Sequence, residues 1–410
     1  MASDAPGLLP AVNSQDNKLT YKPRYIDIGI NLADPIYRGV YRGKTKHQDD
    51  LQAVVSRAKE VGCEKLIVTG SDMTSSKHAL EIAKEYPGIV YTTAGIHPCS
   101  SAIFSKSSAH EEETADGHST PCNPDPDQPV SEDHDPDPEK TASIIAELRN
   151  LFESARETHP GALVAFGEFG LDYDRLHYCS QKLQLHSFAA QLDLVLSLNP
   201  QPPLFLHSRA AHADFIGLLK AKFGPRLEKL ERGGVVHSFT GTAEEMRELA
   251  DLGLYIGTNG CSFKTEENCA VVREIPLQRL MIETDGPWCE VRPTHAGWRY
   301  LLDAKAKSEG IYAFATEESS PATQPQQQQQ QQPKNNTKNS SKRKEPELPE
   351  RWRAVKAEKW VEGAMVKGRN EPCMIERVGQ IVAGVRGEPL RDVCEAAWAN
   401  TVKVFGLDEK

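Results

Sequence analysis

The sequence predicts a (β/α)₈ barrel, and three observations lead to this fold class. Eight short apolar segments have the length of buried strands, and helical patterns follow nearly all of them. Four of these segments end in a histidine or an acidic residue. All carboxyl ends of a closed parallel barrel face one opening, so a barrel gathers these four polar ends, which a doubly wound open sheet would not naturally do.

The predicted elements alternate along the chain. The strands are 25–32, 65–70, 90–96, 163–167, 203–206, 234–236, 254–257 and 280–284. The helices are 47–60, 75–85, 141–158, 181–198, 211–222 and 243–252, with two closing helices at 373–385 and 390–404. Helical spacing of apolar residues carries these assignments, as in 51–58, where Leu51, Val54, Val55 and Ala58 share a face. Asn370 and Pro372 are typical of a helix start and place the beginning of the first closing helix.

Two polar segments interrupt the alternation. Residues 105–140 contain repeated Pro-Asp pairs and clustered Glu, and residues 313–350 contain seven consecutive glutamines. Both segments have few apolar side chains to bury, so both are predicted to be disordered, low-complexity insertions. Residues 1–23 are predicted to be a disordered leader without an export signal. We therefore expect one barrel domain over 24–410, interrupted by the two insertions.

Charge and composition exclude several classes of protein. The net charge is −10, and residues 105–140 alone carry −9, so the body is nearly neutral and has no bulk positive charge to hold nucleic acid. The nine cysteines are scattered without a C-x-x-C pair, which argues against a disulfide framework and for a reducing compartment. No apolar run approaches the ~20 residues of a membrane span. We expect an intracellular protein, cytoplasmic or nuclear; Lys-Arg-Lys at 342–344 is a weak nuclear-import signal or a solvated charge run.

The four polar strand ends are the candidate metal ligands. They are Glu168, His207, His237 and Asp285. A divalent ion that supports hydrolysis needs a few nitrogen or oxygen ligands and an open position for water. A single histidine at a strand end is usually a hydrogen-bonded loop residue. Four such residues at four strand ends favour a metal site.

Three further residues follow strand ends and are predicted to contact substrate. His97 is expected to be a ligand, a hydrogen-bond donor beside the metal, or a phosphate contact. The guanidinium fork of Arg209 suits a pair of phosphate oxygens. For Asp172 and for Arg209, a salt bridge between loops is the alternative to a substrate contact.

A further site role is left open for three residues. Asp27 and Asn31 flank the end of the first strand, and Asp27 is either a metal ligand or a buried, hydrogen-bonded carboxylate. His212 is open in the same way.

Six motifs, in this order, resemble the TatD family of metal-dependent deoxyribonucleases, most closely its eukaryotic type. The resemblance covers about 24–300 and 350–405. The motifs are 27–32 (DIGINL), 95–98 (GIHP), 167–172 (GEFGLD), 206–209 (LHSR), 237–241 (HSFTG) and 283–288 (ETDGPW).

This resemblance implies a (β/α)₈ barrel of the metal-dependent hydrolase superfamily, which hydrolyses DNA phosphodiesters with a metal-activated water, often as a 3′-exonuclease. Mg²⁺ is the implied ion, with Mn²⁺ or Zn²⁺ as alternatives. By motif, Glu168 bridges metals, His207 and His237 are imidazole ligands, and Asp285 is a ligand that also orients or deprotonates the water.

At the end of the first strand the chain departs from the family. Many members carry His-x-His at the end of the first strand, where this chain has Gly29 and Asn31. One or two ions are therefore expected, and one of two would be held more weakly, or only through Glu168, Asp285 and water.

Two other function classes stay open at this stage. The same water attack serves an amide or ester hydrolase, for instance an editing deacylase acting on mischarged tRNA. A non-catalytic scaffold that binds partners through its insertions is the third class.

Overall fold

The computed structural model describes residues 21–106, 129–308, 348 and 350–407. At its centre eight parallel strands form one sheet, in which each strand pairs with the next along the chain. The strands are β1 (Tyr25–Ile30), β4 (Cys63–Val68), β5 (Val90–Ala94), β6 (Leu163–Asp172), β7 (Leu204–Arg209), β8 (Gly234–Val236), β9 (Tyr255–Thr258) and β10 (Leu280–Ile282). The predicted fold class is confirmed.

Beyond β10, backbone hydrogen bonds bring the two edges of the sheet together. The amide of Asp285 donates to the carbonyl oxygen of Gly29 (2.8 Å), and the amide of Asn31 donates to that of Gly286 (2.8 Å). The first strand and the turn after the last strand are thus joined where both reach the carboxyl end of the barrel. This junction places residues 29–31 beside residues 285–286, although about 250 residues separate them in the sequence.

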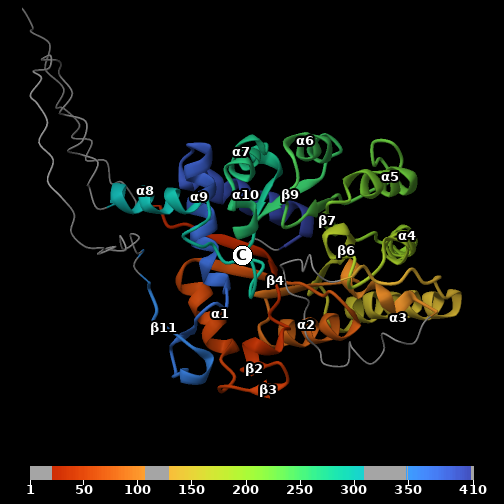
Figure 1. The fold of residues 1–410 in the computed structure, drawn as a ribbon, viewed down its shortest axis with the longest axis horizontal. Coiled ribbons are helices and arrows are strands. Elements are labelled where there is room, and N and C mark those ends of the chain that lie inside the picture. Colours follow the sequence, from red (N-terminus) through yellow and green to blue (C-terminus); the bar gives the residue numbers. More distant parts are fainter. Residues whose placement is uncertain (1–20, 107–128, 309–347, 349, 408–410) are drawn as a thin grey trace, which may run out of the picture.

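Ten α-helices of the described chain surround the strands, and Figure 1 shows them as a ring about the central sheet. They are α1 (Leu51–Glu60), α2 (Met73–Glu85), α3 (Pro138–Thr158), α4 (Gln181–Ser197), α5 (His212–Phe223), α6 (Ala243–Asp251), α7 (Glu266–Glu274), α8 (Trp298–Ser308), α9 (Ile375–Arg386) and α10 (Leu390–Phe405). Two small ribbons lie outside the barrel: β2 (Val40–Tyr41) with β3 (Lys44–Thr45), and β11 (Ala354–Val355) with β12 (Met365–Val366).

A row of phenylalanines fixes β6 against three helices. Phe152 of α3 stacks on Phe166 of β6, and Phe166 packs edge to face against Phe169. The ring centroids of each pair are 5.0 Å apart. Phe169 contacts Phe188 of α4, which stacks on Phe215 of α5, each pair at 5.4 Å. Buried aromatic pairs at such spacings contribute about 0.5–1.5 kcal/mol each beyond their area. The strand that carries Glu168 is therefore held by rigid packing.

Helix α10 packs near the amino ends of β1 and β10, opposite the junction just described. Its Asn400 donates hydrogen bonds to the carbonyl oxygens of Leu277 (2.9 Å) and Leu280 (2.8 Å). Trp398 of the same helix is buried in a cluster with Ile26 of β1. The carboxyl ends of the strands are left as the face for chemistry, as in other barrels of this class.

The predicted ends of the first insertion are wrong. The backbone amide of Lys106 donates to the backbone carbonyl oxygen of Asp135 (3.0 Å), and the amide of Asp137 donates to that of Phe104 (2.8 Å). Helix α3 begins at Pro138 instead of residue 141. The reason is a strong helix start: the Asp137 side chain accepts from the first amides of α3, and Pro138 occupies its first turn. Residues 107–128 of the predicted insertion lie outside the described residues.

Three other predictions need correction or fall partly outside the described chain. Helix α8 was not among the predicted helices, and the second insertion is described only at residues 348 and 350. Residues 1–20 of the predicted leader are not described, but Tyr21 donates to Glu395 of α10 (2.8 Å). Asn370 does not cap the first closing helix, because that helix begins five residues later, at Ile375.

Within the described residues, no helix combines the length and apolar character that crossing a membrane requires.

Candidate metal and active site

Glu168 lies within β6 and not at its end. The strand was predicted to stop at residue 167, but it pairs with β7 as far as Asp172 opposite Arg209. Gly167 and Gly170 have φ angles of 143° and 148°, and a Cβ atom at either would overlap a carbonyl oxygen of β7. Glycine is therefore required for the two strands to approach this closely.

One carboxylate oxygen of Glu168 meets three imidazoles. Its Oε1 lies 2.6 Å from Nε2 of His237, 2.9 Å from Nδ1 of His207 and 3.3 Å from Nε2 of His97. All four side chains are buried, with at most 7% of each residue exposed. Residues from β6, β7 and the ends of β5 and β8 thus converge on one point.

A second carboxylate stands behind each of two imidazoles. Nε2 of His207 lies 3.1 Å from Oδ2 of Asp172, which is also paired with Arg175 (2.8 Å). Nδ1 of His237 lies 3.4 Å from Oε2 of Glu283. Carboxylates that contact the far nitrogen of an imidazole fix its tautomer and orientation, an arrangement typical of metal-binding histidines.

The charges of the cluster shift the pKa values of its members. Burial raises the pKa of Glu168, but the neighbouring His237 and His97 outweigh it and hold that pKa well below the usual range. Burial lowers the pKa of His237, but Glu168 and Glu283 outweigh it and hold that pKa well above its usual value. For His97 burial prevails, and its pKa is lowered.

Both carboxylate oxygens of Asp285 are held by neighbours. Oδ1 accepts a hydrogen bond from Nδ2 of Asn31 (3.1 Å), and Oδ2 accepts one from the thiol of Cys289 (3.1 Å). Asp285 has a φ of 53°, in the left-handed region that non-glycine residues seldom adopt. Hydrogen bonds from both sides therefore fix this carboxylate in the turn that follows β10.

The same turn is also held by a residue from the C-terminal part of the chain. Nδ2 of Asn370 donates to the carbonyl oxygens of Thr284 (2.9 Å) and Trp288 (2.7 Å). Beside it, Arg369 forms ion pairs with Asp50 (2.6 Å) and Glu371 (2.9 Å) in a buried network that also includes Arg57. This network anchors residues 369–371 to α1 and so fixes the position of Asn370.

Gly29 and Asn31, the residues that depart from the family pattern, have structural partners here. A Cβ atom at Gly29 would overlap Oε2 of Glu283, so the space above residue 29 holds the carboxylate that orients His237. Asn31 directs its amide to Asp285 and to the carbonyl oxygen of Gly286. Neither position supplies an imidazole, and both shape the same centre.

The donor set fits a divalent ion. His97, Glu168 and His207 each offer a ligand atom within 4.8 Å of the others, and all three are buried. A second such group, His97, Cys99 and Asp172, shares His97. Nitrogen and oxygen donors with carboxylates behind the imidazoles match the ligands that Zn²⁺, Mn²⁺ and related ions take.

A hollow of about 50 Å³, which we call the central hollow, opens beside the cluster. Asp285 lines it together with Glu168, His207, His237 and His97. Two cationic side chains, Arg175 and Arg209, also reach it; the remaining walls are Asn31, Ser71, Ser238 and Trp288. Two guanidinium groups therefore lie beside the carboxylates of this hollow, although the chain as a whole is acidic.

The other predicted site residues lie outside the central hollow. Asp172 is fully buried behind His207, and Asp27 is fully buried and accepts hydrogen bonds from the amide and hydroxyl of Thr284. His212 pairs with Glu248 of α6 (2.9 Å).

Sequence reasoning missed several residues of the centre. Arg175 follows the selected residue Asp172 by a few positions, and Glu283 precedes the selected residue Asp285 by a few positions. Those short separations were a usable signal for both. No local signal linked Asn370 to this centre.

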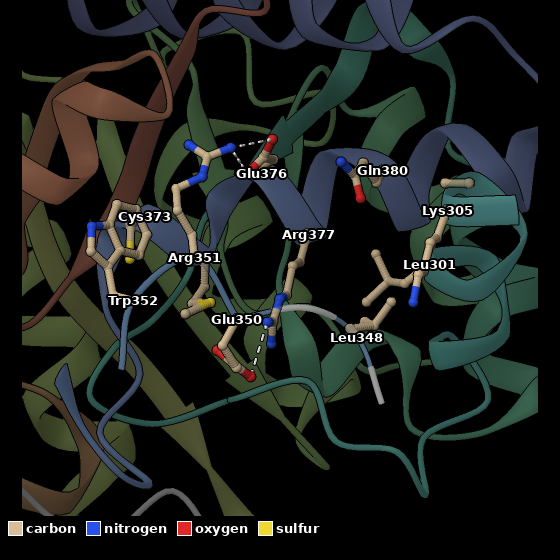
Figure 2. Close-up of a pocket in the computed structure, with 12 residues that line it drawn as sticks. Leu301, Lys305, Leu348, Glu350, Arg351, Trp352, Cys373, Glu376, Arg377 and Gln380 are labelled. Atoms are coloured by element: carbon tan, nitrogen blue, oxygen red, sulfur yellow. Dashed lines mark hydrogen bonds and ion pairs between the residues drawn. The ribbon is translucent and has the colours of Figure 1, made fainter. Parts of the chain in front are cut away.

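A larger hollow of about 550 Å³ lies elsewhere, between α8, α9, residue 348 and residues 350–352. Figure 2 shows its walls, in which Arg351 points to Glu376 and Arg377 to Glu350. None of its lining residues belongs to the two groups of candidate metal ligands within the described chain. The candidate metal ligands of the described chain therefore lie at the central hollow and not at this larger one.

The barrel and its buried imidazole–carboxylate cluster define a hydrolase of the (β/α)₈ class. Residues 26–406 match the model of the TatD related DNase family, and the chain belongs to this family. It is similar to two proteins named deoxyribonuclease Tat-D: one of Schizosaccharomyces pombe, with 38% identity over 93% of this chain and 96% of that protein, and one of Saccharomyces cerevisiae, with 34% identity over 93% and 91%. A protein of Edwardsiella piscicida named 3′-5′ ssDNA/RNA exonuclease TatD is 33% identical over 64% of this chain and 79% of its own length.

Solved structures show the same architecture. A crystal structure of an uncharacterized amidohydrolase from Saccharomyces cerevisiae has a TM-score of 0.70 and 31% identity, covering 93% of this chain and all of that one. A hydrolase of the TatD family from Entamoeba histolytica has a TM-score of 0.67 and 27% identity, covering 94% and 99%.

Proposed function

We propose that this protein is a metal-dependent deoxyribonuclease that removes nucleotides from the 3′ end of single-stranded DNA. The cluster in which Glu168 meets three imidazoles, beside Asp285 and two arginines, is the observation that carries the proposal. The names of the similar proteins, deoxyribonuclease Tat-D and 3′-5′ ssDNA/RNA exonuclease TatD, support the substrate class and the direction.

Glu168, His207 and His237 would hold the ion, with Asp285 as a further ligand from the same hollow. Such an ion, when bound, acts as a Lewis acid that lowers the pKa of water and offsets charge on the phosphate. The family resemblance favours Mg²⁺, and the imidazoles also suit Mn²⁺ or Zn²⁺.

The remaining groups bind the phosphate and move the proton. Asp285 accepts the proton of the attacking water, because its carboxylate is fixed at the edge of the hollow by Asn31 and Cys289. Arg209 and Arg175 bind the non-bridging phosphate oxygens by charge and hydrogen bonding. His97 contacts the phosphate from its position beside Glu168.

The test combines metal analysis with hydrolysis of 5′-labelled single strands. Wild type is expected to bind a divalent ion and shorten the strands, and a chelator should stop the reaction. His207→Ala should lower the rate at least ~100-fold and reduce bound metal. The control His212→Ala removes a histidine that pairs with Glu248 outside the hollow, and it should keep both the rate and the bound metal of wild type. Activity of His207→Ala equal to wild type contradicts the proposal, and cleavage of aminoacyl-tRNA instead of DNA favours the editing deacylase.

A further inference from the structure

A second hollow of about 380 Å³ adjoins the candidate active site, and we propose that it binds the terminal nucleoside of the strand with a free 3′-hydroxyl group. This inference rests on the proposed nuclease function. Asn31 and Ser71 line both this hollow, which we call the side hollow, and the central one, so the two share a wall. A volume of this size is in the range of sites for small ligands, whereas about 50 Å³ beside the cluster leaves little space beyond a phosphate group.

The walls of the side hollow combine apolar surface with hydroxyl groups. They come from the segments that follow β1 and β4, the first two turns of α2 and the 3₁₀-helix η2 (Pro98–Phe104). Met73, Pro35 and Ile103 offer apolar contacts, and the hydroxyls include those of Thr74 and Ser100. A nucleoside has the matching chemistry, because a base has apolar faces and polar edges and the sugar carries a hydroxyl group.

The distribution of charge separates the two hollows. Arg175 and Arg209 line the central hollow beside its two carboxylates, which are proposed metal ligands, whereas no lysine or arginine lines the side hollow. The ionisable residues of its wall are Asp34, Asp72 and the exposed His78. The scissile phosphate therefore belongs between the arginines of the central hollow, and the neutral nucleoside belongs beside Asp34 and Asp72 in the side hollow. A strand that ends in a 3′-phosphate would bring a second anion toward these carboxylates, which costs binding free energy.

Asp72 allows this charge effect to be tested without losing the helix. Its side chain caps α2 by accepting a hydrogen bond from the amide of Ser75 (2.7 Å), and asparagine caps helices about as well as aspartate. Asp72→Asn thus removes the charge and keeps the cap. Glu81→Gln is the matched control, because it removes one negative charge from the exposed side of the same helix, away from the hollow.

The experiment compares kcat/KM for 5′-labelled single strands that end in a 3′-hydroxyl or a 3′-phosphate, with Mg²⁺ or Mn²⁺ present. Wild type is expected to prefer the hydroxyl end about tenfold or more. Asp72→Asn should reduce that preference several-fold, and Glu81→Gln should leave it unchanged. Equal rates at the two ends in wild type, or an unchanged preference in Asp72→Asn, would overturn the assignment of the side hollow while leaving the nuclease function intact. Cleavage of neither strand would overturn the nuclease function and this inference together.

A second variant tests occupancy independently of charge. Thr74→Trp places a bulky side chain in the wall of the side hollow and should raise KM for the hydroxyl-ended strand about tenfold. Lys77→Trp, one turn further along α2 and outside the wall, is the control with the same added bulk. Thermal unfolding of both variants verifies that they fold. An unchanged KM in Thr74→Trp would show that no part of the substrate enters this hollow and would overturn the inference.

Discussion

The side-chain amide of Asn370 donates a hydrogen bond of 2.7 Å to the carbonyl oxygen of Trp288. A second bond of 2.9 Å, to the carbonyl oxygen of Thr284, makes this one side chain span the turn that carries Asp285. A segment that follows α8 and the second predicted insertion thereby determines where the proposed proton acceptor lies. Asn370 is a positioning residue in this view, because it touches the turn and not the substrate.

Asn370→Ala is expected to lower kcat about 10- to 100-fold with little change in KM, because small displacements of a reacting group are costly. Two buried carbonyl groups lose their donor, which should also lower the free energy of unfolding by about 1–3 kcal/mol. Asn400→Ala is the matched control, because Asn400 donates to two carbonyl groups at the opposite end of the barrel. It should lower stability similarly and keep kcat. Equal losses of kcat in both variants would reduce Asn370 to a purely structural role.

Asp172→Asn is expected to weaken metal binding about 10- to 100-fold, because the carboxylate that orients His207 is lost. Calorimetric titration with Mn²⁺ measures this change directly. Asp174→Asn is the control two residues along the chain, where the side chain is exposed. Unchanged affinity in Asp172→Asn would mean that His207 holds its orientation, or binds no metal, without this partner.

Metal binding should release protons. Burial lowers the pKa of His237, but Glu168 and Glu283 raise it well above its usual value, so His237 carries a proton in the metal-free protein near neutral pH. An imidazole must be neutral to bind a metal, so affinity should rise with pH by up to about tenfold per unit for each proton released. Titrations at about pH 6 and about pH 8, in buffers with different heats of ionisation, count these protons. A heat of binding that is independent of the buffer would contradict the assignment of His237 as a ligand.

The contribution of Asp27 to the stability of the barrel should fall as the pH rises from about 4 to about 8. Burial raises the pKa of Asp27 to about 8, although hydrogen bonds from Thr284 oppose this rise. The unfolded chain has already lost this proton above about pH 4, so it binds fewer protons than the folded chain in this interval. The favourable contribution, present in full below about pH 4, is on the order of a few kcal/mol and is lost as the pH approaches about 8.

Asp27→Asn tests this prediction, because asparagine resembles the protonated acid and does not titrate. Urea unfolding at several pH values should show a weaker pH dependence in this variant than in wild type. Identical pH profiles for the two proteins would show that Asp27 is already ionised in the folded state.

The sequence by itself was enough to predict the barrel and the family. Periodic apolar segments mark strands and helices locally, and the direction of a parallel strand determines which of its ends carries the polar residue. Glu168, His207, His237 and Asp285 could therefore be assigned to one face before any contact was known. Their role as metal ligands stays a prediction, which the structure supports by gathering them around one hollow.

Only the tertiary structure decided what surrounds these four residues. Asp172 lies behind His207, Glu283 occupies the space that Gly29 leaves, and Asn370 braces the turn of Asp285. Contacts such as these join residues that lie far apart in the sequence. Asn31 and Asp285, for example, are separated by 254 positions. A local pattern cannot specify such pairs, because whether a carboxylate orients an imidazole or only ends a strand depends on neighbours that the closing of the barrel brings to it.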